Sequence, residues 1–196
     1  MLEAQPSARR ELLPRVRAGF ERATLESFAR DPALNDYVRG RVGEELLDYV
    51  GNARNMTWLD GRRTAALREA QVSFHGWQKT REHYTGLMLE FTEGHLMRTV
   101  AQAMIRIFGV HADKTHKVYP HLWSAFTRDL GQVHGELVRD TACHITFTDA
   151  PVDELDYELV LVMHEAALHA MFRFAKIPAR ITREGSRERA RFEVRW

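Results

Sequence analysis

Four side chains of the kind that bind metal ions or haem lie close together near the middle of the chain. They are His111, Asp113, His116 and His121. Imidazole is the commonest ligand of such groups, and a carboxylate can complete a metal site. The spacing matches no structural zinc site, and no cysteine lies in the cluster. A metal or haem site is therefore one interpretation of the cluster. The other is that these are exposed loop histidines, since ten histidines in 196 residues will cluster by chance.

Two further histidines lie in a segment that superficially resembles the zinc-binding helix of metalloproteases. His164 and His169 are five residues apart, which separates them by about 140° around a helix, whereas the metalloprotease spacing of four gives about 40°. Side chains so placed cannot bind one metal ion from a regular helix. We expect two polar residues at opposite edges of a broad apolar stripe, and we predict no metal site here.

The single cysteine, Cys143, is followed directly by His144. Neighbouring strand residues point to opposite faces of a sheet, so these two cannot form a nucleophile and base pair with each other. Cys143 is predicted on the same strand face as Ile145 and Phe147, which favours a buried inert thiol over a reactive one.

The sequence has no glycine-rich phosphate loop, nucleophile elbow or paired carboxylates, so we predict that the chain is not an enzyme. An enzyme would require two or more histidines to meet in a cleft beside a carboxylate. The candidates for such a cleft are His95, His111, His116 and His169.

Arginines are frequent along the last two predicted strands. They are Arg180, Arg183, Arg187, Arg189, Arg191 and Arg195. Glutamates interleave with them, which indicates a solvated strand face. A nucleic-acid site would add stacking aromatic side chains on that face, but Phe192 and Trp196 point the other way. We predict no binding of nucleic acid.

Charge and cysteine content narrow the class of protein. Lys plus Arg number 28 against 27 for Asp plus Glu, so the surface as a whole has no field that would attract nucleic acid or an anionic membrane. One cysteine excludes an internal disulfide and suits a reducing compartment. No apolar run forms a signal peptide or reaches the roughly 20 residues of a spanning helix. We expect a cytoplasmic protein without a membrane partner.

The first two thirds of the chain carry helical patterns. Residues 15–20 form either a short strand or a turn, and residues 52–60 are predicted as a loop. Helices are predicted over 21–30, 33–50 and 112–126, and over 62–108 in about three pieces broken near Gly76 and Gly94. Asp31 and Pro32 supply the N-cap and the first residue of the second helix.

After Gly131 the apolar period changes from 3.6 to 2, which is typical of strands. Strands are predicted over 132–138, 141–148, 177–183 and 188–196, with a helix from 149 to about 175. The clearest alternation is in the last strand, whose inward residues are Ala190, Phe192, Val194 and Trp196.

These patterns predict an α+β fold: an N-terminal helical layer followed by a C-terminal antiparallel β-β-α-β-β unit. We expect a single domain over 1–196, with residues 1–13 frayed, a mainly helical part over 14–130 and the β-β-α-β-β part over 131–196.

This order of elements resembles the superfamily that contains the haem nitric-oxide/oxygen-binding (H-NOX) domains and the 4-vinyl-reductase domains. The chain is also similar to a myxobacterial family of uncharacterised proteins of this length. That similarity is carried by the segments Val16-Arg-Ala-Gly-Phe, Ala101-Gln-Ala-Met-Ile-Arg-Ile-Phe-Gly, Tyr119-Pro-His-Leu-Trp and Arg191-Phe-Glu-Val-Arg-Trp196. The resemblance implies a ligand-sensing or signalling domain, often a homodimer, with a pocket between the helical layer and a curved sheet.

In the haem-binding members the proximal histidine lies on the helix before a Tyr-Pro step, which corresponds here to His111 or His116 ahead of Tyr119. Those members also carry a Tyr-x-Ser-x-Arg motif that binds the haem propionates after the hairpin. This chain has Thr146-Phe-Thr-Asp-Ala-Pro151 there, with no arginine to pair two carboxylates. The resemblance therefore leaves a haem- or metal-binding sensor, through His111 or His116, as the alternative hypothesis.

The first hypothesis is a non-enzymatic sensor or signalling module that binds a small apolar ligand or a protein partner. Its pocket is predicted between the helix that ends near Phe108 and the inner face of the sheet. The expected lining is Leu96, Val100, Met104, Trp123 and Phe126. A homodimer and a signalling protein partner are expected, and the cofactor, if any, is left open.

Overall fold

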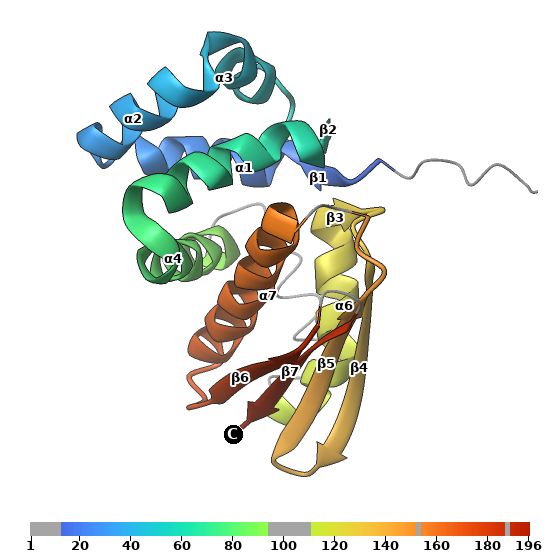
Figure 1. Ribbon diagram of the computed structural model, residues 1–196. Coiled ribbons are helices and arrows are strands. Elements are labelled where there is room, and N and C mark those ends of the chain that lie inside the picture. The colour runs from blue at the N-terminus through green and yellow to red at the C-terminus, as the bar shows by residue number, and fades with distance from the viewer. Residues whose placement is uncertain (1–12, 94–110, 152–153, 187–188) are drawn as a thin grey trace, which may run out of the picture.

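The chain folds into a helical layer followed by a sheet with helices on one face, as the computed structural model shows (Figure 1). The structure describes residues 13–93, 111–151, 154–186 and 189–196. The predicted break near Gly94, the buried stripe that begins at Leu96 and most of the predicted frayed segment lie outside these described residues.

The N-terminal part contains most of the helices. Its elements are β1 (Arg15–Arg17), α1 (Ala18–Phe28), α2 (Pro32–Val42), α3 (Glu44–Gly51), β2 (Trp58–Asp60) and α4 (Gly61–Glu93). The C-terminal part contains most of the strands. Its elements are the 3-10 helix η1 (Ala112–Lys114), α6 (Thr115–Phe126), β3 (Thr127–Arg128), β4 (Gln132–Arg139), β5 (Ala142–Thr148), α7 (Glu154–Phe174), β6 (Arg180–Gly185) and β7 (Arg189–Arg195).

One aspartate and two glycines decide where the N-terminal helices begin, end and bend. The side chain of Asp31 accepts two backbone N–H groups of the first turn of α2, and Pro32 follows as the first helical residue, as predicted. The single helix predicted over 33–50 is wrong, because Gly43 has a φ of +77° and separates α2 from α3. Gly76, at a φ of +75°, bends α4 where the sequence predicts a break.

A small sheet connects the two parts of the chain. Its strand order is β2-β1-β3, and β1 pairs antiparallel with both neighbours. The loop predicted over 52–60 is therefore wrong at its end, because β2 pairs with a strand far away in the sequence and local pattern does not show such a partner. Val16, Leu59 and Thr127 are the buried residues of this sheet.

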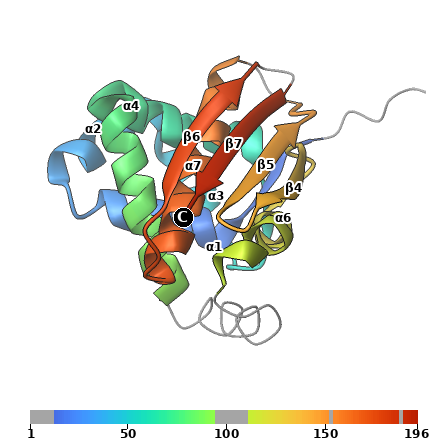
Figure 2. The same ribbon diagram turned by 90° about the horizontal axis from the view of Figure 1, so that it is seen from below.

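The larger sheet has the strand order β4-β5-β7-β6, and all its neighbours are antiparallel. This confirms the predicted β-β-α-β-β unit. Ile145 pairs with Phe192 and Cys143 with Val194, so that the alternating apolar residues of both central strands lie on one buried face. Figure 2 shows α7 and the N-terminal helices behind that face, with the strands in front.

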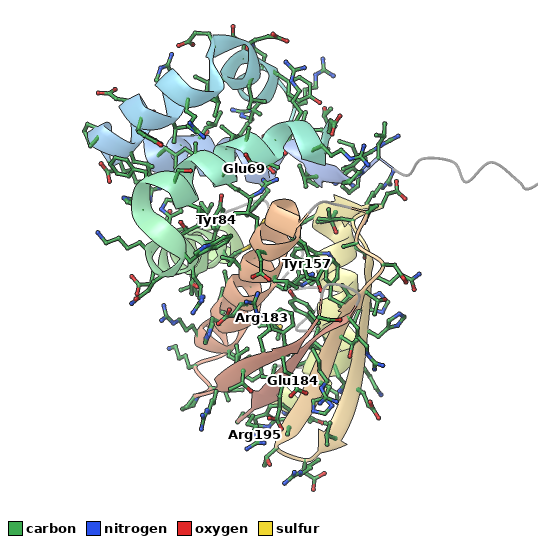
Figure 3. The ribbon with its side chains drawn as sticks, viewed as in Figure 1. Glu69, Tyr84, Tyr157, Arg183, Glu184 and Arg195 are labelled. Carbon is green, nitrogen blue, oxygen red and sulfur yellow. The ribbon has the colours of Figure 1, made fainter. Side chains whose placement is uncertain are left out.

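The opposite face of the larger sheet is polar, and several of its charges are paired. Arg191 forms an ion pair with Glu184 on the neighbouring strand, and Arg195 pairs with Glu193 at 2.7 Å. On the other face of the edge strand, the one that α7 covers, Arg183 reaches Glu158 of α7 at 3.0 Å; Figure 3 labels Arg183, Glu184 and Arg195 along β6 and β7. The predicted solvated strand face is thereby confirmed.

Helix α7 is buried on nearly every side, because it lies between the larger sheet and α4. The predicted stripe is buried at Leu159, Val162, Ala166 and Ala170, but so are residues on the remaining faces, such as Leu161 and Leu168. A helix that is apolar all round is typical of such a central position. None of the described helices is both long and apolar enough to cross a membrane.

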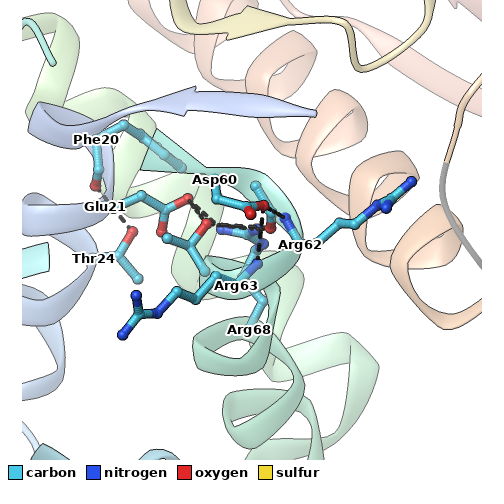
Figure 4. A network of polar contacts seen from close by, with 9 residues as sticks. Phe20, Glu21, Thr24, Asp60, Arg62, Arg63 and Arg68 are labelled. Atoms are coloured by element: carbon cyan, nitrogen blue, oxygen red, sulfur yellow. Dashed lines mark hydrogen bonds and ion pairs between the residues drawn. The ribbon is translucent and has the colours of Figure 1, made fainter. Parts of the chain in front are cut away.

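A buried ion pair joins α1 to α4 (Figure 4). Glu21 is fully buried and Arg68 is 5% exposed, and the two side chains form an ion pair. The hydroxyl of Thr64 donates a second hydrogen bond to Glu21 at 3.2 Å. Since loss of one partner leaves a buried charge without compensation, this contact holds the two helices in one register.

Gly135 of β4 has no room for a side chain, because a Cβ there would overlap the carbonyl group of His116 on α6. We expect Gly135→Ala to lower the free energy of unfolding by about 2–3 kcal/mol, since α6 must move off β4. Gly86 of α4 is the matched control: a Cβ there meets nothing within 4 Å, and Gly86→Ala should raise the free energy of unfolding by about 0.5–1 kcal/mol. Urea unfolding followed by circular dichroism measures both. A Gly135→Ala protein as stable as the wild type would contradict the packing of α6 on β4.

Candidate functional site

A pocket of about 440 Å³ opens beside the C-terminal end of α6. It lies between that helix, β3, the start of β4 and the turn that joins the two strands. The lining residues are Pro120, Trp123, Ser124, Thr127, Arg128, Asp129, Leu130, Gly131 and Val133. This volume suits a small molecule, and the lining combines an aromatic wall with a few polar groups.

The turn that closes the pocket depends on two residues with positive φ. Asp129 has a φ of +54° and Gly131 a φ of +110°. A Cβ at Gly131 would overlap the ring of Phe147, so glycine is required where the turn meets the sheet. At the other end, the hydroxyl of Thr127 donates to the carbonyl of Trp123 at 3.1 Å and fixes the last turn of α6.

Trp123 forms the inner wall of the pocket. Its side chain is 5% exposed, and its ring stacks on the imidazole of His164, with the ring centroids 3.7 Å apart and an interplanar angle of 26°. Phe147 of the sheet lies on the same imidazole at 4.6 Å. The space behind Trp123 is therefore filled by aromatic side chains, and the pocket ends at this residue.

His164 lies in the centre of the core, which differs from the predicted position at the edge of an apolar stripe. It is fully buried, and the hydroxyl of Tyr119 lies 2.7 Å from its Nδ1 and 3.3 Å from its carbonyl oxygen. Its Nε2 has no hydrogen-bond partner among the described residues. Burial lowers the pKa of His164 to about 3, because an imidazolium would lose its hydration there. The side chain is neutral at physiological pH and joins α6 to α7.

The two candidate haem ligands are in different environments. His111 is exposed and precedes η1. His116 is half-buried in the first turn of α6, and its Nδ1 is buried without a hydrogen-bond partner among the described residues. No group of three or more His, Cys, Asp or Glu side chains that could hold a metal ion occurs in the described part of the chain.

The predicted pocket residues separate into two sets. Trp123 lines the observed pocket, whereas Phe126 is half-buried and lies outside its lining. The remaining predicted lining residues, Leu96, Val100 and Met104, lie outside the described residues.

Two other predicted features concern possible catalysis. Cys143 is fully buried, and burial raises the pKa of its thiol to about 12, as expected of an inert cysteine. His169 is half-buried on α7, five residues from the buried His164. His95, a further candidate for a catalytic cleft, lies outside the described residues.

The pairing of Tyr119 with His164 was missed from the sequence, although one signal points to it. Tyr119 and Trp123 are four residues apart and therefore lie on one face of α6, despite Pro120 between them. The side chain that meets this face belongs to a helix 45 residues further along the chain at His164, so only the tertiary structure identifies it.

The fold is shared with solved H-NOX proteins. The Fe(II) unliganded H-NOX protein from K. algicida is similar over 91% of this chain and 95% of its own, with a TM-score of 0.59 and 8% identity. A mutant H-NOX from T. Tengcongensis is similar over 91% and 96%, with a TM-score of 0.53 and 10% identity. No family model and no curated protein matches the chain. The H-NOX-like fold predicted from the sequence is thus confirmed, while the similarity to a myxobacterial family stays a prediction.

The buried imidazole makes the stability of the fold depend on pH. Between pH 6.5 and 3 the unfolded chain binds a proton at His164 that the folded chain does not bind, so stability decreases as the pH falls through this range. We expect this residue to remove about 2 kcal/mol of the free energy of unfolding between pH 7 and pH 5. In His164→Phe, which retains a ring beside Trp123, the decrease should be smaller by that amount.

Urea unfolding at several pH values measures this effect. The exposed His121 of α6 supplies the control, since His121→Phe should keep the pH dependence of the wild type. Equal pH dependence in the wild type and His164→Phe would show that His164 is not held neutral by burial.

Proposed function

We propose that this chain is a non-enzymatic, cytoplasmic sensor module that binds a small ligand in the pocket beside α6. The pocket of about 440 Å³ carries this proposal. Its inner wall, Trp123, stacks on His164 of α7, so a ligand that displaces the indole changes the packing of the central helix. Through α7 the change reaches α4, against which α7 packs.

Haem is the alternative ligand, because of what the similar structures contain. One is described as an Fe(II) H-NOX protein, and another, with a TM-score of 0.52, belongs to a study of haem distortion in the H-NOX family. His116 is the better placed of the two histidines, since His111 is exposed and the ring of His116 has a buried nitrogen without a partner among the described residues.

The described residues nevertheless do not fit a haem. Two propionates require cationic partners, but the segment after the β4–β5 hairpin ends in Thr148 and Asp149, whose side chains bond to each other at 3.2 Å. A carboxylate at this place repels an anionic group. The inner face of the sheet near α6 is also occupied, because His164 stacks on Trp123 and contacts the tilted ring of Phe147. We therefore propose a sensor that works without haem.

A homodimer and a protein partner are further parts of the proposal. Exposed aromatic side chains gather where α2 meets the bend of α4: Tyr37 and Phe74 lie 5.2 Å apart between ring centroids, and Trp77 follows the bend at Gly76. Aromatic residues of this kind are enriched in protein interfaces. This surface is separate from the pocket beside α6.

Filling the pocket should abolish binding of an apolar probe. N-phenyl-1-naphthylamine is a neutral aromatic dye whose fluorescence rises in apolar sites, and we expect it to bind the wild type with a stoichiometry of about one. Ser124 is exposed on α6 and lines the pocket, so Ser124→Phe should lower the affinity for the dye at least about tenfold by occupying its space.

His121→Phe is the matched control, because His121 is exposed on the same helix but outside the pocket lining. Its affinity for the dye should equal that of the wild type. Binding that survives Ser124→Phe, or that is lost equally in both variants, would contradict the proposed site.

The haem alternative predicts a different spectrum. We expect no Soret band in the protein as purified, and no stoichiometric Soret band after incubation with haem and removal of the excess, because the segment after the β4–β5 hairpin offers the propionates a carboxylate in place of an arginine. Absorbance spectroscopy measures this directly. A stoichiometric Soret band that His116→Ala removes and His111→Ala retains would replace the proposed function with a haem sensor that uses His116.

A further inference from the structure

One face of the small sheet gathers three arginines around a tryptophan. Val16, Leu59 and Thr127 are buried on the inner face of this sheet. Because strand residues alternate, the residues next to them point outward. They include Arg15 and Arg17 of β1, Trp58 of β2 and Arg128 of β3, which together form what we term the arginine face.

Two of these arginines are held in place against the tryptophan. The guanidinium carbon of Arg17 lies 3.6 Å from the centre of the Trp58 ring, and that of Arg128 lies 4.4 Å from it. Arg17 also donates from Nε to the carbonyl of Ala125 at 3.2 Å and from a terminal nitrogen to the carbonyl of Met56 at 2.5 Å. These bonds hold Arg17 in place, whereas the guanidinium of Arg128, stacked on the same ring, can meet an acceptor with its edge N–H groups at little cost in conformational entropy.

The charges of the arginine face are not neutralised by ion pairs with other described residues. Arg15 lies directly opposite Arg128 in the strand register, a like-charged pair that destabilises a sheet. Arg15 also lies opposite Asp60, whose carboxylate offsets part of this positive charge and whose Oδ1 accepts the backbone N–H groups that open α4 (Figure 4). Burial and the neighbouring Arg128 charge both lower the pKa of Arg17. On the outer face of the larger sheet, Arg191 and Arg195 each have a glutamate partner, although Arg195 also lies directly opposite Arg180.

The arginine face continues into the pocket beside α6. Arg128 belongs to both, because its guanidinium lies over Trp58 and the residue is one of those that line the pocket with Trp123. Asp129 also belongs to the lining and is exposed. Arg15 is not part of the lining, but it lies directly opposite Arg128 in the strand register.

We propose that the arginine face makes the pocket selective for an oxyanion: the ligand is a small molecule with a carboxylate or phosphate group, which Arg128 and Arg15 bind while its apolar part packs on Trp123. This inference rests on the proposed function, because it names the chemical class of ligand for the same pocket. Binding of an anion relieves the repulsion between the opposed arginines and forms charge-assisted hydrogen bonds.

A matched pair of dyes tests the charge preference. 1-Anilinonaphthalene-8-sulfonate and N-phenyl-1-naphthylamine share their aromatic rings, and only the first carries an anionic group. Fluorescence titration of the full chain should give an affinity about tenfold higher for the sulfonate dye. Higher salt should remove that advantage and leave the neutral dye unaffected, since only exposed charges are screened.

Substitutions assign the preference to individual arginines. Arg15→Gln and Arg128→Gln should each lower the affinity for the sulfonate dye about threefold or more and leave the neutral dye unchanged. Arg41, an exposed arginine of α2, supplies the control Arg41→Gln, which should change neither affinity. Arg15→Gln should also unfold at the same temperature as the wild type or a higher one, because it removes the repulsion with Arg128. Lower affinity without lower stability separates recognition of the anion from a merely structural role.

Competition then distinguishes the two kinds of oxyanion. Pyrophosphate and succinate are each titrated against the bound sulfonate dye, and the more effective competitor identifies a phosphate- or carboxylate-bearing ligand. Equal affinities for the two dyes, or a preference that both Arg15→Gln and Arg128→Gln retain, would overturn the proposal. Binding of a poly-glutamate peptide without competition by either small anion would also overturn it, and would assign the face to a protein partner.

The two proposals fail in different ways. If both dyes bind with equal affinity and Ser124→Phe abolishes binding of both, the pocket is real and the charge preference is wrong. If Ser124→Phe changes the affinity for neither dye, the pocket is not the binding site and the proposed function itself is wrong.

Discussion

The burial of the middle of α7 is the constraint on which the rest of the structure depends. This part of the helix lies between the larger sheet and α4, so most of its side chains are apolar and must fit both neighbours. The sheet supplies the central strands β5 and β7, whose buried face alternates strictly with a polar outer face. Where α7 meets the part of α4 that follows the bend, the charge of Glu165 is compensated by an ion pair with Arg81 at 3.3 Å.

A neutral histidine in the centre of this helix links the core to the pocket. His164 is satisfied at one nitrogen by Tyr119, and its ring is covered by Trp123, so α6 is fixed on α7 by a hydrogen bond and by stacking. The same tryptophan then forms the wall of the pocket, and the turn at Gly131 closes it. A site that shares its wall with the core is suited to sensing, because occupancy and core packing cannot change independently.

The arginines of the two sheets differ in their partners. On the outer face of the larger sheet, Arg191 and Arg195 each pair with a glutamate on the same or the neighbouring strand. On the small sheet, by contrast, Arg15, Arg17 and Arg128 face one another around Trp58 without such partners among the described residues. The balanced net charge of the chain hides this difference, because the formal total of +1 sums over both faces.

The sequence alone determined the fold class and the β-β-α-β-β unit, because apolar periods of 2 and 3.6 are local properties that burial imposes on strands and helices. It also determined the inert Cys143 and the polar outer strand face, both of which follow from alternation. Only the tertiary structure decided the split at Gly43, the pairing of β2, the central place of His164 and the meeting of Arg17 with Arg128. The last three depend on partners distant in the sequence, and no local pattern contains the geometry of such a contact, whereas the split at Gly43 depends on the backbone conformation that this glycine adopts.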